Sequence, residues 1–219
     1  MNFNLMDIDR WPRKPYFEHY FNHVNCTYSI TANIEIRLLR EELKRMDMKL
    51  YPALIHMLTT VVNRHNEFRT CLDSEGRLGV WDQMSPSFTI FHEKHKSFSS
   101  LCTPFSEDFQ TFYSRYLQVI TKYKNTDQLF PDPHEPPNTF SISSIPWVSF
   151  TGFNLNVYSG EAYLLPIFTL GKYVWQDTKL MLPLSVQFHH AVCDGYHAGV
   201  LFNELQQLAE ECKSWLGGS

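Results

Sequence analysis

The chain has 219 residues, of which 43% are hydrophobic and 15% aromatic, so it can bury a sizeable core. Its 19 Lys and Arg and 23 Asp and Glu give a net charge of −4, which argues against nucleic-acid binding because that function needs a concentrated basic surface. No apolar run approaches the roughly 18 residues of a membrane-spanning helix, and the N-terminus lacks the basic and apolar stretches of a signal peptide.

The cysteines indicate a reducing compartment. There are five, at positions 26, 71, 102, 193 and 212, without a CxxC pair, so neither a disulfide framework nor a zinc ribbon is predicted. The proline cluster at 131–137 indicates a surface loop, because apolar segments of similar composition continue on both sides. We therefore expect a cytoplasmic protein with a single domain over residues 1–219.

The predicted elements mix strands, which are rich in β-branched and aromatic residues, with helices, whose apolar residues recur every three or four positions. In chain order they are a strand at 27–36, helices at 37–48 and 51–65, a hairpin of 69–72 and 78–81, a strand at 88–92, a helix at 107–123, strands at 140–144, 148–157, 167–175 and 180–188, and a helix at 195–215. Frequent hairpins predict an α/β fold of the two-layer α+β kind, with a mixed, partly antiparallel sheet and helices packed on one face.

The segment 187–197 carries the most chemistry, because a buried strand there runs into a tight turn and then a helix. His189 and His190 are adjacent in the strand, so they point to opposite faces and cannot do the same job. Asp194 can cap the new helix, or it can hold a cation and so fix the turn. His189, His190, Asp194 and His197 are also possible metal ligands, but the two adjacent histidines diverge and no Glu is spaced to act as a base, so we expect no metal.

This segment resembles the active-site signature of chloramphenicol acetyltransferases, which is built around His-x-x-x-Asp-Gly and starts here at His190. Further segments resemble the family in the same order, at 49–52, 80–82, 143–148, 154–157 and 171–173, so the resemblance covers essentially the whole chain. The short signature alone is shared with the dihydrolipoyl acyltransferase cores of 2-oxo-acid dehydrogenase complexes. The resemblance therefore implies a fold related to those cores.

The resemblance implies transfer of the acetyl group of acetyl-CoA to the 3-hydroxyl of chloramphenicol, which inactivates the antibiotic and confers resistance. It assigns His190 as the general base of a direct attack, a role that suits an imidazole because it titrates near neutral pH. It assigns Ser143 as the hydrogen-bond donor to the developing oxyanion. Asp194 and Arg13 are expected to form an ion pair that braces the catalytic loop.

The family pattern also implies two binding regions. The drug pocket is expected to comprise Tyr20, Cys26, Tyr28, Phe98, Phe130, Leu155, Val157 and Thr169, the last of which would hold an ordered water. Acetyl-CoA, a co-substrate rather than a tightly bound cofactor, is expected against Lys49, Tyr51, Trp147, Lys172 and Tyr173. The family is a homotrimer with its active sites between subunits, so His190 would come from one chain and most of the drug pocket from its neighbour. Neither nucleic acid nor membrane is expected as a partner.

Two alternatives remain at this point. One is a dihydrolipoyl-type acyltransferase core, although the sequence contains no lipoyl domain and no Ala/Pro-rich linker. The other is a non-catalytic trimeric binding protein that keeps the fold. One position departs from the family pattern, because Phe188 stands where a small aliphatic residue is usual. We expect its side chain to pack into the sheet, away from His190.

Overall fold

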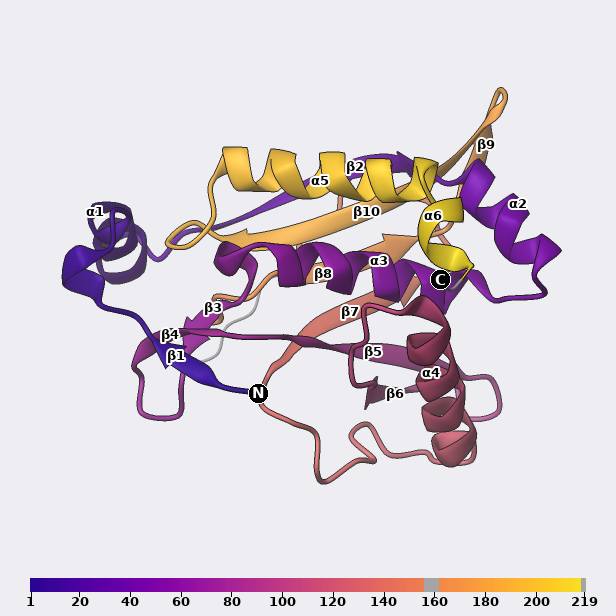
Figure 1. Cartoon of the computed structure of the whole chain (residues 1–219), viewed down its shortest axis with the longest axis horizontal. Helices are drawn as coiled ribbons and strands as arrows, with labels where there is room; N and C mark the ends of the chain where they lie inside the picture. The colour runs from indigo at the N-terminus through magenta and orange to yellow at the C-terminus, as the bar shows by residue number, and fades with distance from the viewer. Residues whose placement is uncertain (156–161, 218–219) are drawn as a thin grey trace.

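A computed structural model describes residues 1–155 and 162–217 (Figure 1). The strands are β1 (Phe3–Leu5), β2 (Thr27–Glu35), β3 (Thr70–Leu72), β4 (Leu78–Trp81), β5 (Ser85–His92), β6 (Ser97–Cys102), β7 (Thr139–Ile145), β8 (Ile167–Gly171), β9 (Val174–Gln176) and β10 (Lys179–His189). The α-helices are α1 (Lys14–Glu18), α2 (Arg37–Arg45), α3 (Leu50–Arg64), α4 (Phe109–Tyr123), α5 (Gly195–Glu210) and α6 (Lys213–Leu216). Short helical turns are η1 (Ile8–Arg10), η2 (His19–His23) and η3 (Asn66–Phe68).

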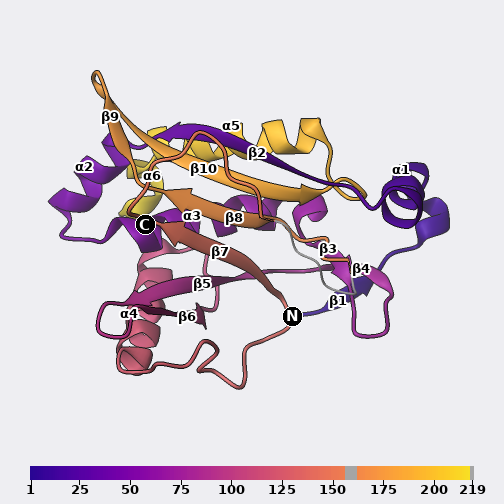
Figure 2. The ribbon, with the colours of Figure 1, turned by 180° about the vertical axis from the view of Figure 1, so that it is seen from behind.

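The main sheet of the described residues is mixed. Its strand order is β2-β10-β8-β7-β5-β6, with β9 paired to one end of β10. β7 is parallel to both of its neighbours, whereas the other pairs are antiparallel. Helices α3 and α5 lie in front of this sheet in Figure 1, and the strands lie in front of them when the molecule is seen from behind in Figure 2. The predicted mixed sheet with helices on one face is confirmed.

The face of the sheet toward the helices forms the core. Ile142 of β7, Phe168 of β8 and Val186 of β10 are cross-strand neighbours and are at most 1% exposed. Phe88 of β5 continues this row and packs its ring against Tyr116 of α4. Burying a side chain of this size contributes about 1.5–3 kcal/mol, so this layer holds the strands in register.

The opposite face carries a row of hydroxyl groups. Ser143 of β7 pairs with Thr169 of β8, which pairs with Ser185 of β10, which pairs with Thr31 of β2. The Phe153 amide donates to the Thr31 hydroxyl at 3.3 Å, and the Ser185 hydroxyl donates to the Phe153 carbonyl at 2.7 Å. The segment after β7 therefore lies across this face of the sheet, as Figure 2 shows.

These contacts explain why one predicted strand is wrong. The described part of 148–157 is not a strand, because Phe153 bonds to side chains on the sheet face instead of to a neighbouring strand. The close approach needs a glycine in β8, since a Cβ on Gly171 would lie 2.7 Å from the Phe150 ring. The predicted strand 167–175 is divided into β8 and β9, and the Lys172 amide between them bonds to the Val148 carbonyl at 2.9 Å.

The last helix also differs from the prediction, and two strands were not predicted. The last predicted helix ends at Glu210, and α6 follows after a break. β6 was not predicted, because its serine-rich sequence lacks the β-branched residues that mark a strand. A small sheet of β1, β4 and β3 contains the predicted hairpin together with an unpredicted N-terminal strand. Within 1–155 and 162–217, no helix is long and apolar enough to cross a membrane.

Candidate active site

The histidine turn, which we define as residues 190–194, joins the end of β10 to the start of α5. The His190 amide donates to the Cys26 carbonyl at 2.8 Å, which continues the pairing of β10 with β2 beyond the last strand residue. The His190 imidazole stacks on the Tyr20 ring, with centroids 3.9 Å apart and planes 9° apart. The Tyr28 ring meets it nearly edge-on at 5.2 Å. The imidazole is thus held by two rings while remaining partly exposed.

The two adjacent histidines have different environments, as predicted. His189 is 2% exposed, and its Nδ1 accepts from the Ala191 amide at 3.2 Å while its Nε2 faces the Asn25 side-chain oxygen at 3.3 Å. Burial, with a smaller contribution from His190, lowers the pKa of His189 to about 4. His189 is therefore neutral at neutral pH and helps to shape the turn, and His190 is the more exposed of the two imidazoles.

Asp194 braces the histidine turn from the N-cap position of α5. Its carboxylate accepts from the Tyr196 amide at 3.0 Å and from Arg13 Nη1 at 2.8 Å. Burial opposes the charged form, but the Arg13 hydrogen bond and the nearby His197 outweigh it and lower the pKa of Asp194 to about 2. Asp194 thus combines the two roles that the sequence left open, because it both caps the helix and pairs with a cation.

Cys193, which also belongs to the histidine turn, does not supply a nucleophile. Burial raises the pKa of the Cys193 thiol, which donates to the Glu67 carbonyl at 3.6 Å, so Cys193 is not a thiolate at neutral pH. Phe188 is 1% exposed, as expected, but it is not isolated from His190. Its ring contacts Tyr28 at 5.5 Å, and the same tyrosine contacts His190. The expectation that Phe188 points away from the site is therefore only partly right.

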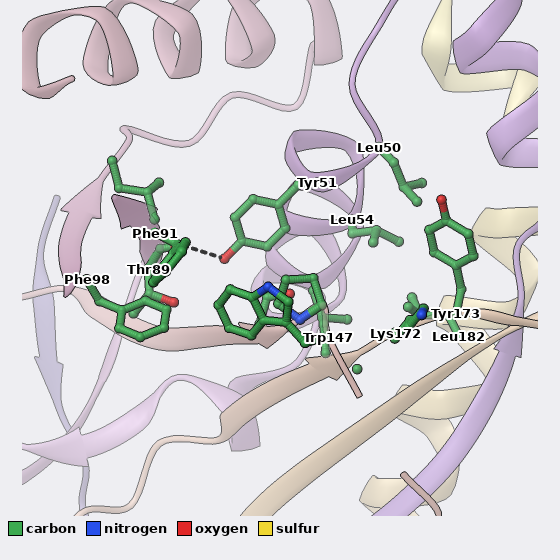
Figure 3. Close-up of a pocket in the computed structure, with 15 residues that line it drawn as sticks. Leu50, Tyr51, Leu54, Thr89, Phe91, Phe98, Trp147, Lys172, Tyr173 and Leu182 are labelled. Carbon is green, nitrogen blue, oxygen red and sulfur yellow. Dashed lines mark hydrogen bonds between the residues drawn. The ribbon is translucent and has the colours of Figure 1, made fainter. Parts of the chain in front are cut away.

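A gap in the main sheet creates the second part of the site. β5 pairs with β7 only as far as Phe88 and Ile142, after which β5 continues along β6 and β7 continues along β8. A cavity of about 520 Å³ lies between the diverging strands, and we call it the strand-gap cavity. It is lined by Leu50, Tyr51, Leu54, Thr89, Ile90, Phe91, Phe98, Ser144, Pro146, Trp147, Leu170, Gly171, Lys172, Tyr173 and Leu182 (Figure 3).

Aromatic side chains give the strand-gap cavity its shape. The Tyr51 hydroxyl points from α3 across the opening and donates to the Thr89 carbonyl at 3.1 Å (Figure 3). Trp147 stands edge-on against Phe91 at 4.8 Å and lies 6.2 Å from Phe98. The result is a slot with an apolar interior, lined on one side by α3 and on the other by the end of β7.

The structure brings most of the predicted CoA residues together. Tyr51, Trp147, Lys172 and Tyr173 all line the strand-gap cavity. Lys49 directly precedes its lining residue Leu50 and occupies the N-cap position of α3 without a side-chain capping bond. Sequence reasoning missed Arg40 of α2, whose guanidinium carbon lies 5.3 Å from the Tyr173 ring centroid and adds a cation at this end of the cavity.

The predicted drug-pocket residues are spread over three places. Tyr20, Cys26 and Tyr28 surround His190. Phe98 lines the strand-gap cavity, and Val157 lies outside the described residues. The remaining three are on the face away from the helices.

On that face, Thr169 belongs to the hydroxyl row, and Leu155 is 40% exposed two residues after Phe153. Phe130 lines a separate cavity with Ser100 and Ser141. Its loop is attached to the edge strand β6, since the Ser100 amide donates to the Leu129 carbonyl at 2.7 Å.

His190 and Ser143 do not meet within one chain. Ser143 is in register with Ser185, two strands away, and His190 lies five positions beyond Ser185. At about 3.3 Å per residue and about 4.8 Å per strand spacing, their Cα atoms are roughly 19 Å apart. A base and an oxyanion donor cannot act on one carbonyl carbon across that distance. Within the part of the chain that the structure describes, no three His, Cys, Asp or Glu side chains gather as a metal site.

Comparisons with known proteins identify the family. A family model described as chloramphenicol acetyltransferase matches residues 1–206. Chloramphenicol acetyltransferases of Clostridium perfringens and Staphylococcus aureus are 58% identical over 217 residues and 47% identical over 216 residues. The first alignment covers 99% of both chains, and the second covers 99% of this chain and 100% of the relative.

Solved structures show the same fold. A chloramphenicol acetyltransferase superimposes with a TM-score of 0.85 at 21% identity, over 95% of this chain and 100% of that chain. The dihydrolipoamide acetyltransferase of Azotobacter vinelandii has a TM-score of 0.66 at 16% identity, over 93% of this chain and 88% of that chain. The expected relation to dihydrolipoyl acyltransferase cores is confirmed at the level of the fold, and the matches in sequence show that the chain belongs to the chloramphenicol acetyltransferase family of enzymes.

Proposed function

We propose that this protein transfers the acetyl group of acetyl-CoA to the 3-hydroxyl of chloramphenicol and so confers resistance to the drug. The observation that carries the proposal is the His190 imidazole, held between Tyr20 and Tyr28 at the end of β10 and braced by the ion pair of Asp194 with Arg13. The whole-chain similarity to acetyltransferases named for this drug supports chloramphenicol as the substrate.

The reaction follows from the weak nucleophilicity of an alcohol. His190 removes the hydroxyl proton as the alcohol oxygen attacks the thioester carbonyl carbon, and this forms a tetrahedral intermediate with a negatively charged oxygen. The Ser143 hydroxyl donates to that oxygen, and Thr169, its neighbour in the hydroxyl row, holds a water nearby. Collapse of the intermediate breaks the carbon–sulfur bond, and the CoA thiolate takes the proton that His190 carries.

The site needs two copies of the chain, because His190 and Ser143 lie roughly 19 Å apart in one copy. A homotrimer, in which each single-domain subunit presents its histidine turn to the hydroxyl row of the next, completes three equivalent sites. The drug then lies between Tyr20, Cys26 and Tyr28 of one subunit and the Thr169 face of its neighbour. The apolar walls of this pocket are predicted to include Leu155, Val157, Phe98 and Phe130.

Acetyl-CoA fits the strand-gap cavity as a co-substrate. The apolar interior beside Tyr51 and Trp147 suits the pantetheine arm, which is long, thin and weakly polar. Lys172 and Arg40 lie at the Tyr173 end, where they suit the phosphate groups, and Lys49, next to the lining residue Leu50, stays a prediction for the same role. The thioester would then reach through the sheet toward Ser143, while the nucleotide stays near α2 and α3. Both substrates are met in the cytoplasm, where we place the enzyme.

The test is release of free CoA thiol from acetyl-CoA by the purified protein. We expect turnover with chloramphenicol and none with an analogue that lacks the 3-hydroxyl. A chelator in a parallel reaction leaves the rate unchanged. Turnover with dihydrolipoamide but not chloramphenicol would instead identify a dihydrolipoyl-type enzyme, which the structural similarity to that family makes the second candidate. No turnover with either acceptor would favour a binding protein.

A further inference from the structure

His197 lies in the first turn of α5 and shares the Asp194 carboxylate with Arg13. Asp194 Oδ2 accepts from Arg13 Nη1 at 2.8 Å, and the other oxygen, Oδ1, lies 2.9 Å from His197 Nδ1. The His197 side chain is only 15% exposed. The carboxylate that braces the histidine turn therefore has an imidazole as well as a guanidinium against it.

Two groups of Asp194 approach the same His197 nitrogen. Nδ1 lies 2.9 Å from Asp194 Oδ1 and 3.2 Å from the Asp194 amide nitrogen, and one ring nitrogen cannot donate to the first and accept from the second at once. An unprotonated Nδ1 accepts from the Asp194 amide and completes the capping box of α5, but it then directs its lone pair at a carboxylate oxygen that is closer, at 2.9 Å, which is repulsive. A proton on Nδ1 converts the same contact into a charge-assisted hydrogen bond.

The other His197 nitrogen leads to a separate element. Nε2 lies 3.8 Å from the Glu67 carboxylate in η3, and the Glu67 carbonyl accepts from the Cys193 thiol at 3.6 Å. The next residue of η3, Phe68, places its ring 6.1 Å from that of Phe188 at the end of β10. The histidine turn is thus linked to the N-terminal segment through Arg13 and to η3 through the Cys193 thiol, while His197 lies beside Glu67.

We propose that His197 is a positioning residue for the acetyl transfer: its Nδ1–H holds Asp194, which in turn fixes the histidine turn that carries His190. His197 does not touch the substrates and acts only through Asp194 on the placement of His190. This inference rests on the proposed function, because it concerns the rate of the same reaction.

The test compares His197→Ala with His197→Asn. The amide nitrogen of Asn occupies nearly the place of Nδ1 and can donate to Asp194, whereas Ala removes the donor. We expect His197→Ala to lower kcat about tenfold, because small misplacements of a catalytic group are costly, with the KM for both substrates nearly unchanged. His197→Asn recovers most of the lost kcat. The matched control is Asn63→Ala, which removes hydrogen bonds to both Met84 backbone groups and lowers the melting temperature without lowering kcat.

The outcomes separate this inference from the proposed function. If the wild-type protein does not acetylate chloramphenicol, the proposed function itself is wrong. If the wild type is active and His197→Ala keeps its full kcat, or His197→Asn loses as much as His197→Ala, the positioning role is wrong. If His197→Ala and His197→Asn show the same fall in kcat together with the same fall in melting temperature, as a purely structural residue would, the positioning role is also wrong.

Discussion

The His190 imidazole lies flat on the Tyr20 ring, with centroids 3.9 Å apart and planes 9° apart. Tyr20 belongs to η2, a short π-helical turn, and the Cys26 amide bonds back to its carbonyl at 3.2 Å. The stack therefore connects the proposed base to the N-terminal segment that also supplies Arg13. A ring pressed against one face of the imidazole limits its rotation, as the proposed proton transfer from an alcohol requires.

Tyr20→Ala tests this stack. Such aromatic contacts contribute about 0.5–1.5 kcal/mol, so we expect kcat to fall about two- to thirteenfold. Tyr20→Phe keeps the ring and should retain a kcat close to that of the wild type. Steady-state kinetics with both substrates makes the comparison, and equal losses in the two variants would mean that the hydroxyl, not the stack, matters.

His190→Ala tests the base. Removing a general base lowers kcat by about 10²–10⁴-fold, while the protein still binds acetyl-CoA and chloramphenicol, because the cavity residues are unchanged. Equilibrium binding and single-turnover kinetics separate the two effects. The matched control is His189→Gln, which changes the adjacent imidazole but keeps an Nε2-like donor toward Asn25. Full activity of His190→Ala would contradict the proposed mechanism.

The local parts of the site were predictable from the sequence, because a strand, a turn and a helix following one another place His190 and Asp194 four residues apart. The partner of Asp194 was not predictable in this way. Arg13 lies 181 residues away in the chain, and only the family resemblance connected the two residues. His197 was visible as a titratable residue in the first turn of α5, but its contact with Asp194 depends on the shape of the cap.

Segment 148–155 and β6 show two opposite errors of secondary-structure prediction from the sequence. The first has the aromatic and β-branched composition of a strand, yet it crosses the sheet because Thr31 and Ser185 satisfy the Phe153 backbone. The second is rich in serine, yet it forms a strand because β5 offers it an open edge. In both cases tertiary hydrogen bonds overrode local propensity. The strand-gap cavity was equally hidden, since it arises where β5 and β7 stop pairing.

The ion pair of Arg13 with Asp194 should stabilise the fold as well as the turn. Their side chains are 17% and 32% exposed, so removing either one leaves a polar partner incompletely solvated. We expect Asp194→Ala to lower the free energy of unfolding by about 1–3 kcal/mol in urea. A double-mutant cycle with Arg13→Ala isolates the coupling between them. The control is the surface pair of Lys96 with Glu93, whose side chains are 72% and 75% exposed and whose coupling should be below about 1 kcal/mol.

The buried His189 makes stability depend on pH. Its pKa is about 4 in the folded protein and returns to the ordinary value of 6.5 when the chain unfolds. Between pH 4 and 6.5 this imidazole is protonated in the unfolded chain but not in the folded protein. The stabilisation that comes from keeping His189 neutral is therefore fully present above pH 6.5, and it is lost as the pH falls toward 4. The loss approaches about 1.4 kcal/mol per pH unit within this window.

His189→Gln has no titrating ring at this position and should therefore lose less stability than the wild type between pH 6.5 and 4. Urea unfolding at a series of pH values, at one protein concentration, measures the difference. His134→Gln, in an exposed loop, is the control and should follow the wild type. Parallel curves for wild type and His189→Gln would show that this imidazole is not held neutral in the folded protein.

The separation of His190 from Ser143 leads to a test of the shared site. A trimer of His190→Ala subunits has oxyanion donors but no base, and a trimer of Ser143→Ala subunits has bases but no oxyanion donor. When the two proteins are unfolded, mixed in equal amounts and refolded together, random assembly gives about one site in four with both groups intact. We therefore expect the mixture to recover about a quarter of the wild-type kcat per site.

This recovery distinguishes a site between subunits from a site within one. If His190 and Ser143 of the same chain acted together, every chain in the mixture would lack one group, and mixing could not restore activity. Each variant refolded alone gives the baseline, and a sedimentation measurement shows whether both form trimers. The ratio of the variants adds a further constraint, because activity should be highest at equal amounts and fall toward the baseline on either side. A mixture that stays at the baseline while assembling into trimers would mean that the two residues do not serve one active site.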